Sequence, residues 1–291
     1  MKTILVTGAT GYLGHYVVLE LLKNAEFHVI AIGGRPQDKT NPLPTNPRLS
    51  VYLLDDLFTR DFGKIDTVIN CAFARSNDPV LLAEAIDFTT RAINRFVDIG
   101  IGSLINISTQ GVYERLETGI SSNEDSPIRP IDLYSMVKYS VEKLFEVSSI
   151  PFVTNVRLAS LMMPQRFLYF FVKKAVEGEH FSVTAPDQQA SLLDVTDAAS
   201  GLVALAALEP SSRDKLYNLG IGRQYSILDY AESVKRIGEQ IGYHVDFDVV
   251  HNDTANNSGM DCARLMGDTG WRPKIFKDEM IYNLFMTFKT K

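Results

Sequence analysis

The sequence predicts a doubly wound α/β fold with a parallel central sheet, followed by a smaller α/β part. Three observations support this prediction. Apolar runs rich in Val and Ile alternate with stretches of helical periodicity through the first half of the chain. These runs are nearly continuous in apolar character, as expected for strands that helices cover on both faces. A glycine-rich turn also joins the first run to the first helical stretch.

In the first half, apolar runs are expected to form strands at residues 3–7, 27–32, 49–54, 67–71, 103–108 and 152–156. Helical periodicity between them predicts helices at 12–24, 80–99 and 133–148. Two stretches rich in Pro, Gly, Asn and Ser, at 34–47 and 114–131, are expected to be loops. Both follow strand ends, where open α/β sheets bind ligands.

The second half has a different pattern. Helices are expected at 166–177, 196–208, 227–241 and 277–288. Short strands fit at 181–184, 192–195, 216–218 and 245–250. The length of 291 residues is compatible with one large domain or with two closely joined ones.

The composition is that of an ordinary globular protein, with 45% hydrophobic and 22% charged residues. Its 29 basic and 35 acidic residues give a formal net charge of −6, so neither a nucleic acid nor an anionic membrane is expected as a partner. Two cysteines, Cys71 and Cys262, and five histidines share no metal-ligand spacing, and no metal site is predicted. No signal peptide or membrane-spanning run is visible, so the cytoplasm is the expected location.

The glycine-rich turn reads Thr-Gly-Ala-Thr-Gly-Tyr-Leu-Gly over residues 7–14. Gly8 can take the tight turn, Gly11 lets the backbone approach a pyrophosphate, and Gly14 lets the helix pack closely on the strand. Amide groups at the start of the helix then face the phosphates. We therefore predict a Rossmann-type dinucleotide site that includes Gly8, Thr10, Gly11, Tyr12, Leu13 and Gly14.

Tyr134 and Lys138 form a second candidate site within the expected helix 133–148. They are four residues apart, so a helix places them on one face, one turn apart. A nearby ammonium lowers the pKa of a phenol, which suits a general acid/base that exchanges a proton with an alcohol or a carbonyl. The alternative is a partly exposed helix with an incidental Tyr/Lys pair.

Hydroxyl side chains follow the expected strand 103–108, at Ser108 and Thr109. A hydroxyl at this strand end is able to hydrogen-bond the oxygen that is oxidised or reduced. Turn formation is the alternative role. The chain has no Gly-x-Ser-x-Gly elbow here and no histidine nearby, so Ser108 is not expected to act as a nucleophile.

Together these features resemble the extended branch of the short-chain dehydrogenase/reductase superfamily, the NAD-dependent epimerase/dehydratase family, over essentially the whole chain. Residues 7–14 match its cofactor motif, Asp56 and Leu57 its adenine-contacting pair, and Asn70, Cys71 and Ala72 the segment that lines the cofactor after the fourth strand. Residues 157–164, 193–198 and 267–273 resemble later landmarks of the branch.

The resemblance also implies roles for the candidate catalytic residues. Thr109 matches the family's catalytic Ser/Thr, while Tyr134 and Lys138 match its acid/base pair. Tyr134 would exchange the hydroxyl proton while hydride passes to or from the nicotinamide. Lys138 would hold the nicotinamide ribose and tune Tyr134, and Thr109 would fix the reacting oxygen. Cys71 is expected to pack beside the cofactor as a small apolar side chain.

The cofactor expected is NADP, with NAD as the alternative. Sites that prefer NAD usually place an acidic residue about twenty residues past the glycines to bind the ribose hydroxyls. Here the second strand is followed by Gly33, Gly34 and Arg35, with no acidic residue. The planar guanidinium of Arg35 suits a 2′-phosphate, whereas the alternative is a solvated loop arginine.

Departures from the family pattern narrow the reaction. Dehydratases of the family carry an Asp-Glu pair after the catalytic threonine, where this chain has Gln110 and Gly111, so 4,6-dehydration is disfavoured. Many members that act on nucleotide sugars carry two further arginines. This chain has Ala190 at the position that corresponds to one of them, and the other, expected near Asn257, is missing. This puts recognition of a diphosphate in doubt, although three other cations are able to compensate, namely Arg166, Lys173 and Lys174.

The resemblance therefore implies an NAD(P)-dependent oxidoreductase or epimerase that acts on a hydroxyl or keto carbon of a nucleotide-linked sugar. One alternative is an NADPH-dependent reductase of a non-nucleotide carbonyl compound, and another is a cofactor-sensing regulator without turnover. Helices 80–99 and 133–148 correspond to those that form the superfamily's dimer interface, so a homodimer is expected. The expected division assigns 1–163 and 188–212 to the dinucleotide-binding domain, and 164–187 and 213–291 to the substrate-binding part.

Overall fold

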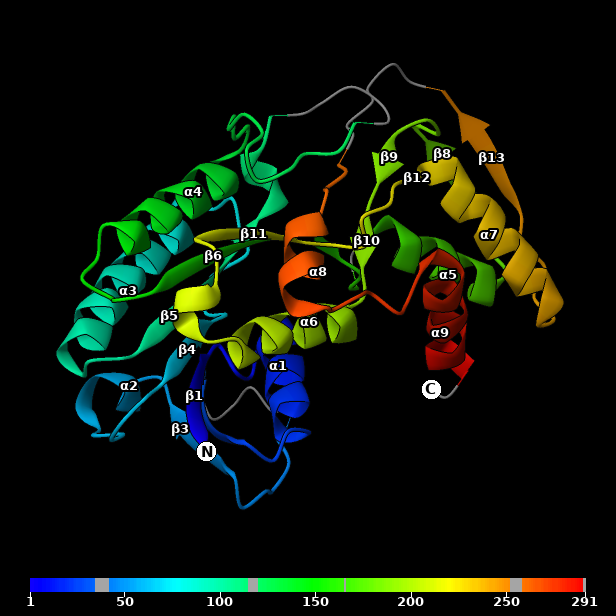
Figure 1. Ribbon diagram of the computed structural model, residues 1–291. Helices are drawn as coiled ribbons and strands as arrows, with labels where there is room; N and C mark the ends of the chain where they lie inside the picture. Colours follow the sequence, from blue (N-terminus) through cyan, green and yellow to red (C-terminus); the bar gives the residue numbers. More distant parts are fainter. Residues whose placement is uncertain (35–41, 115–119, 165, 252–257, 290–291) are drawn as a thin grey trace.

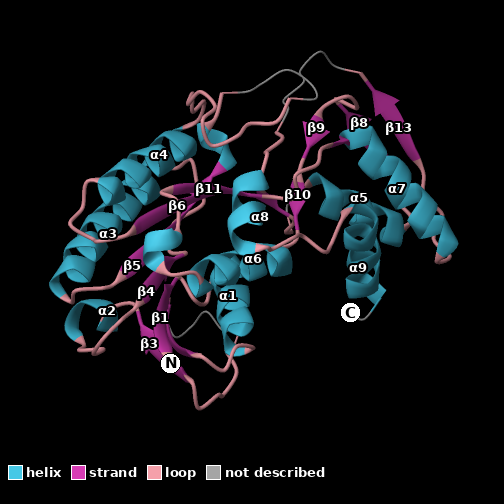
Figure 2. Cartoon of the chain, in the orientation of Figure 1, coloured by secondary structure: helices cyan, strands magenta, loops and turns pink. Residues whose placement is uncertain are grey.

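The computed structural model describes residues 1–34, 42–114, 120–164, 166–251 and 258–289, and Arg35 and Asn257 lie outside these ranges. A seven-stranded parallel sheet forms its centre (Figures 1 and 2), in the spatial order β11-β6-β5-β4-β1-β2-β3. The strands are β1 (Lys2–Thr7), β2 (Phe27–Gly33), β3 (Leu49–Leu53), β4 (Thr67–Asn70), β5 (Ser103–Thr109), β6 (Val153–Leu158) and β11 (Leu216–Leu219). The doubly wound α/β prediction is confirmed.

Helices cover both faces of this sheet, because alternate side chains of each strand are buried on opposite sides. On β1, Ile4 and Val6 pack toward α1 (Tyr12–Leu22) and α6 (Val195–Ala207). Leu5 points the other way, into a core shared with α3 (Pro79–Asp98) and α4 (Leu133–Glu146). The two layers are separate in Figure 2.

A row of buried amide and hydroxyl groups crosses the sheet and fixes the register of its central strands. Thr7 Oγ1 donates to Asn70 Oδ1 at 2.7 Å, Asn70 donates to Asn106 at 3.1 Å, and Asn106 donates to Asn155 at 2.9 Å. A slip of one residue would leave these buried groups without partners. The register brings the carboxyl ends of β1, β4 and β5 to the same edge of the sheet.

The second half forms a smaller cluster with its own core. Here α5 (Phe167–Glu177), α7 (Ile227–Gln240) and α9 (Lys277–Lys289) pack together beside a parallel strand pair, β8 (Phe181–Thr184) and β13 (Phe247–Val250). Two-residue strand pairs complete the part between the cores: β7 (Ser160–Leu161) with β10 (Leu192–Leu193), and β9 (Gln189–Ala190) with β12 (Tyr225–Ser226).

The structure differs from the expected division at β11. The expected division assigns this strand to the substrate-binding part, yet it pairs with β6 as the edge of the central sheet, and α8 (Ala263–Thr269) packs against it. Tyr217 and Leu219 are buried in the core of that sheet. Residues 216–219 are therefore structurally part of the first unit, whereas the rest of the division stays a prediction.

The other differences are small. The strand expected at 192–195 ends at Leu193, because Asp194 caps α6 by accepting from the Thr196 amide at 2.8 Å. The short helices α2 (Asp56–Thr59) and α8 were not expected.

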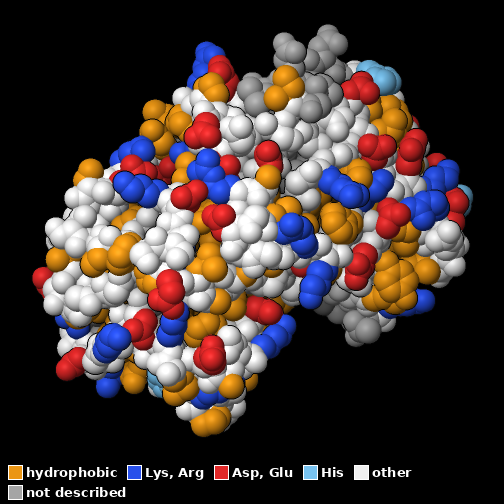
Figure 3. Space-filling view, in the orientation of Figure 1, with side chains coloured by type: hydrophobic (Ala, Val, Ile, Leu, Met, Phe, Trp, Pro, Cys, Tyr) orange, Lys and Arg blue, Asp and Glu red, His pale blue; other side chains and the backbone are white. Residues whose placement is uncertain are grey.

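Figure 3 shows acidic and basic side chains interspersed on the face in view. No helix in the described part of the chain combines the length and apolar character needed to cross a membrane.

Candidate functional site

The glycine turn between β1 and α1 is folded tightly against the end of β4. Gly8 has a left-handed φ of +64°, and a Cβ there would lie 2.9 Å from the Ala72 backbone. A Cβ at Gly14 would overlap the carbonyl oxygen of Gly8. Because only glycine fits both positions, the roles expected of Gly8 in the turn and of Gly14 in helix packing agree with the geometry.

The start of α1 leaves its first amides available to a ligand. Gly11 is the N-cap residue and offers no side chain to accept a hydrogen bond from the first turn. The first N–H groups of a helix have no partner within it, and the helix dipole adds positive potential there. This turn therefore fits the pyrophosphate of a dinucleotide.

The side chains of the other predicted residues in this turn bind within the protein. Thr10 Oγ1 accepts from the Gly34 amide at 3.0 Å, and this bond ties the turn to the end of β2. The Tyr12 hydroxyl donates to the Met162 carbonyl at 2.8 Å. Tyr12 therefore offers a cofactor only its backbone, whereas Leu13 lines the adjacent cavity.

Asp56 and Leu57 lie at the carboxyl end of β3, where α2 begins. Asp56 Oδ2 accepts from the Leu53 amide at 2.9 Å, and the Leu57 side chain is fully buried in the core. Neither residue lines the cavity. Their contact with an adenine stays a prediction.

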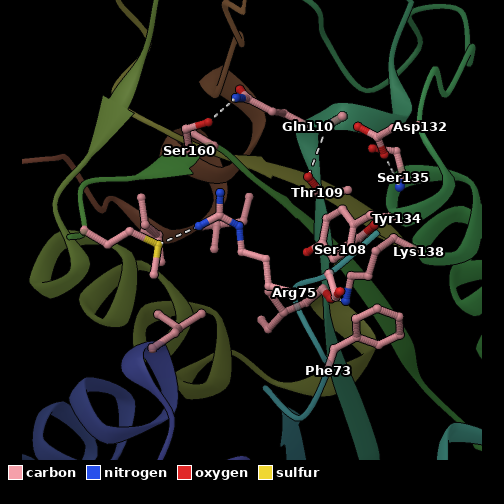
Figure 4. Close-up of a pocket in the computed structure, with 18 of the residues that line it drawn as sticks. Phe73, Arg75, Ser108, Thr109, Gln110, Asp132, Tyr134, Ser135, Lys138 and Ser160 are labelled. Atoms are coloured by element: carbon pink, nitrogen blue, oxygen red, sulfur yellow. Dashed lines mark hydrogen bonds between the residues drawn. The ribbon is translucent and has the colours of Figure 1, made fainter. Parts of the chain in front are cut away.

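A cavity of about 750 Å³ opens at the carboxyl edge of the sheet, between the ends of β4, β5 and β6 and the start of α4 (Figure 4). This size suits a small-molecule site. Five of the predicted residues line it together: Leu13, Cys71, Thr109, Tyr134 and Lys138. Burial raises the pKa of the Cys71 thiol to about 12, so the thiol stays neutral at ordinary pH, and its packing beside a cofactor stays a prediction.

Two side chains hold the start of α4 at this cavity. Asp132 is the N-cap and accepts from the Ser135 amide at 2.7 Å. Asn77, in the loop after β4, accepts from the Tyr134 amide at 2.9 Å. Gly111 completes the contact, because a Cβ there would overlap Ser135 Oγ. Tyr134 is thus positioned from both sides of the cavity.

The phenol of Tyr134 is influenced by groups other than Lys138. Burial raises the pKa of this phenol above its ordinary value, and Asp132 adds to the rise. Arg75 and Arg166 act in the opposite direction and offset part of it. Its ring packs edge-on against Phe73 with centroids 5.9 Å apart. Lys138 is expected from the sequence to lower the pKa of Tyr134, but it is not among the groups that shift this pKa.

Lys138 is directed toward the end of β5 and toward Phe73. Its ammonium donates to the Ile107 carbonyl and lies 4.1 Å from the centroid of the Phe73 ring. Burial lowers the pKa of Lys138 to about 8, while Glu142 raises it. Tyr134 and Lys138 share one face of α4, as predicted, and both line the cavity. The ammonium of Lys138 is bound to the Ile107 carbonyl, one helical turn from Tyr134.

The two hydroxyls after β5 have different partners. Ser108 is buried and donates to Glu142, which in turn binds Arg157 through both oxygens, at 2.8 and 3.1 Å. Thr109 Oγ1 accepts from the Gly111 amide at 3.2 Å and stays at the cavity surface, where its proton is available to a ligand oxygen. Thr109 is therefore the better candidate to bind a reacting oxygen.

A second cavity of about 340 Å³ adjoins the first and shares part of its lining: Gln110, Gly111, Asp132, Ser160 and Arg166. Gln110 donates to Ser160 Oγ at 3.0 Å. Segments far apart in sequence close its far side, since the Ser122 amide donates to the Gly259 carbonyl at 3.0 Å.

Sequence reasoning missed several residues of this site. Glu142 had a readable signal, because it follows Lys138 by four residues on the same helix face. Phe73, Arg75 and Asn77 had none beyond their position after a strand end. Of the three candidate cations, only Arg166 reaches the cavities; Lys173 pairs with Glu177 and Lys174 with Glu179.

Comparison with known proteins gives a family model and relatives that cover most of the chain. The family model described as the NAD dependent epimerase/dehydratase family matches residues 4–220. A UDP-glucose 4-epimerase from Halalkalibacterium halodurans is 23% identical over 93% of this chain and 90% of its own. A dTDP-4-dehydro-6-deoxy-D-allose reductase from Streptomyces bikiniensis is 26% identical over 81% of each chain.

Solved structures share the fold over nearly the whole chain. A UDP-glucuronic acid 4-epimerase from Bacillus cereus, in complex with UDP-glucuronic acid and NAD, superposes with a TM-score of 0.80 at 22% identity and covers 98% of this chain and 99% of its own. A UDP-glucose 4-epimerase from Thermus thermophilus in complex with NAD gives a TM-score of 0.79 at 20% identity, with 99% of both chains covered.

Proposed function

We propose, since this chain belongs to the NAD dependent epimerase/dehydratase family, that it is an enzyme that oxidises, reduces or epimerises a hydroxyl carbon of a nucleotide-linked sugar. The observation that supports this most is the meeting of Thr109, Tyr134 and Lys138 in one cavity beside the glycine turn. The relatives named above include both epimerases and a reductase of nucleotide sugars.

In this proposal each side chain has one task. Tyr134 exchanges a proton with the sugar oxygen, and Thr109 donates a hydrogen bond to that oxygen and fixes its position. Lys138 holds the end of β5 and supplies positive charge to the cofactor side of the cavity. A bound nicotinamide dinucleotide supplies the hydride chemistry.

Dehydration is not part of the proposed activity. It requires a second acid/base pair after the catalytic threonine, and the chain has Gln110 and Gly111 there. The Gln110 amide is engaged with Ser160, and Gly111 provides space for Ser135. Neither residue can exchange a proton with a substrate carbon.

For the cofactor we propose NADP in preference to NAD. The support is the absence of an acidic residue directly after β2, where Gly33 and Gly34 precede Arg35. Gly33 leaves space for the Thr10 side chain, since a Cβ there would lie 2.7 Å from Thr10 Cγ2. NAD remains the alternative, because solved relatives carry it.

We also propose a homodimer formed through α3 and α4. These helices pack side by side on one face of the sheet and expose several apolar side chains: Val80, Leu81, Leu133 and Met136. Burying such a patch is favourable in water. Gel filtration with light scattering should give twice the chain mass, and charged substitutions at Leu81 and Met136 should give the monomer. The cytoplasmic location stays a prediction from the sequence.

The decisive experiment mixes the purified protein with NADP or NAD and a panel of UDP-, GDP- and dTDP-sugars. Nicotinamide absorbance reports net oxidation or reduction, and product chromatography with mass detection reports epimerisation without net redox change. Conversion of at least one nucleotide sugar is expected. Oxidation of NADPH by simple ketones alone would instead establish the alternative, a non-nucleotide carbonyl reductase. Cofactor binding without any turnover would indicate the regulator.

A further inference from the structure

Two segments that lie far apart in the sequence pair to form one wall of the smaller cavity. The Ser122 amide donates to the Gly259 carbonyl at 3.0 Å, and the Asp261 amide donates back to the Ser122 carbonyl at 2.9 Å. Ser122 and Met260 form a single parallel bridge between the two segments, and both residues line the cavity. A bridge of this length is not stable by itself in water, so other contacts must hold the wall in place.

One buried side chain binds both segments of this wall. Asn218, on the edge strand β11, is fully buried, and its Nδ2 donates to the Ser122 carbonyl at 3.1 Å and to the Asp261 carbonyl at 3.0 Å. The backbone amide of Asn218 also donates to Glu124 Oε1 at 2.8 Å. A side-chain amide has two N–H donors, and here one is used for each segment. Asn218 thus ties the wall to the central sheet.

Tyr113 fixes the direction in which the Asn218 side chain faces. Its hydroxyl donates to Asn218 Oδ1 at 2.6 Å, so the oxygen end of the amide points to the phenol and the nitrogen end points to the wall. Burial raises the pKa of the Tyr113 phenol, so the hydroxyl keeps the proton that it donates. Without this donor the Oδ1 acceptor would be buried and unpaired, or the amide would turn and place its oxygen against two carbonyl oxygens.

The ring of Tyr113 is held in turn by a buried ion pair. Arg157 and Asn218 are direct neighbours in register across β6 and β11, and the guanidinium of Arg157 lies 4.7 Å from the centroid of the Tyr113 ring. Both oxygens of Glu142, on α4, bind this guanidinium. The ring, and with it the hydroxyl that reaches Asn218, is therefore fixed between the central sheet and α4.

Tyr113 directly follows η1 (Gln110–Val112), the short 3-10 turn that begins after Thr109. We propose that Tyr113 and Asn218 are positioning residues: their hydrogen bond holds the wall of the smaller cavity in a fixed place relative to Thr109, so that the wall encloses the part of the substrate beyond the reacting carbon. The inference rests on the proposed function, because it takes Thr109 as the residue that binds the reacting oxygen. It gives neither positioning residue a proton to exchange with the substrate.

The test removes this one hydroxyl. Tyr113→Phe keeps the stacked ring and deletes only the donor to Asn218. Tyr217→Phe is the matched control, because Tyr217 is also buried on β11. Its hydroxyl donates to Asp268 at 2.7 Å and accepts from the Asp214 amide at 2.9 Å, outside the described lining of both cavities. Asn218→Ala, alone and combined with Tyr113→Phe, removes the side chain that the hydroxyl orients. Thermal unfolding shows whether each variant is folded.

Two readouts are measured in the protein saturated with NADP or NAD. Amide hydrogen exchange of Ser122 and Asp261, followed by NMR, reports the pairing of the wall. Calorimetric titration with UDP-glucose, or with a nucleotide sugar of the panel that is converted, reports substrate enclosure. In Tyr113→Phe, exchange of both amides should be about fivefold faster or more, and affinity for the sugar should fall by a similar factor.

The other parameters should distinguish positioning from a general loss of stability. For a converted sugar, KM should rise in Tyr113→Phe while kcat and dinucleotide affinity stay within about twofold. The control Tyr217→Phe should change neither readout. Tyr113→Phe should add little to the effect of Asn218→Ala, because the hydroxyl then has no side chain to orient.

Other outcomes overturn the inference. Unchanged exchange in Tyr113→Phe would mean that the hydroxyl does not hold the wall, and faster exchange with unchanged sugar affinity would mean that the wall does not enclose the substrate. Equal effects in Tyr217→Phe would indicate a loss of stability alone. If Asn218→Ala does not fold, Tyr113→Phe and its control decide the question. If no nucleotide sugar binds to the unaltered protein, the proposed function fails in its nucleotide-linked form and the enclosure fails with it, whereas hydrogen exchange needs no substrate and still decides whether the hydroxyl holds the wall.

Discussion

The ammonium nitrogen of Lys138 lies 4.1 Å from the centroid of the Phe73 ring. The face of an aromatic ring attracts a cation, so Phe73 supports a charge that burial disfavours. The same ring packs edge-on against Tyr134. Phe73 therefore contacts both members of the proposed acid/base pair, and the structure links them through this side chain.

The pH dependence of cofactor binding should follow Lys138. Its pKa is lowered from 10.5 to about 8, so in the folded protein the ammonium loses its proton as the pH rises through 8. Cofactor affinity, measured by fluorescence titration between pH 6 and 10, should fall above about pH 8. In Lys138→Met the affinity should be weaker and should not change over this range. A pH-independent affinity in the unaltered protein would contradict the charged role.

Replacement of Tyr134 by Phe should lower kcat by about 100-fold or more, because it removes the proton that the phenol exchanges. Cofactor affinity should stay within about twofold, since the ring and its contact with Phe73 remain. Tyr282→Phe is the control, as Tyr282 is exposed on α9. Full activity of the Tyr134 variant would refute the acid/base assignment.

Replacement of Glu142 by Gln should affect both stability and the pH profile. The variant leaves Arg157 charged and buried without its ion pair, which typically costs about 3–5 kcal/mol of unfolding free energy. Because Glu142 raises the pKa of Lys138, its neutralisation should move the loss of cofactor affinity to lower pH. Glu177→Gln, which breaks an exposed pair with Lys173, should cost less than about 1 kcal/mol and leave the profile unchanged. A destabilised variant with the original profile would limit Glu142 to a structural role.

Gly8→Ala and Gly63→Ala form a matched pair, because both positions have a left-handed φ, +64° and +66°. Each alanine should cost about 1 kcal/mol through backbone strain. Only at Gly8 would the new Cβ also lie 2.9 Å from the Ala72 backbone, whereas at Gly63 no atom lies within 4 Å. Dinucleotide affinity should fall about tenfold or more in Gly8→Ala and stay constant in Gly63→Ala. If both variants are shown by urea unfolding to be folded and their dinucleotide affinities are equal, the turn is not the phosphate site.

Arg35→Ala should weaken NADP binding by about tenfold or more and leave NAD binding nearly unchanged, because only NADP carries the 2′-phosphate that a guanidinium would hold. Isothermal titration with both dinucleotides measures this. Arg236→Ala serves as the charge-matched control. Equal losses for NADP and NAD would remove the argument for NADP.

The sheet and the helices with clear periodicity could be predicted from the sequence because their signals are local. For example, the apolar run at residues 103–108 predicts a strand, and the observed strand β5 is only one residue longer, at its carboxyl end. The place of β11 could not be predicted, since its four residues carry no sign of which strand they pair with. Its neighbour was decided by packing across the whole sheet.

The same distinction applies to the site. Tyr134 and Lys138 are one helical turn apart, so their common face follows from spacing. The charges that act on the phenol, Arg75 and Arg166, come from two loops that meet only in the folded chain. Hence the sequence indicates the candidate acid/base groups, whereas folding determines which charges surround them.

The hydrogen bond from Ser122 to Gly259 joins segments 137 residues apart, because 259 − 122 = 137. During translation all seven strands of the central sheet are synthesised before Gly259. The nascent chain can pair its early strands by then, yet the smaller cavity still lacks one wall. The smaller cavity is thus enclosed well after the glycine turn between β1 and α1 has left the ribosome.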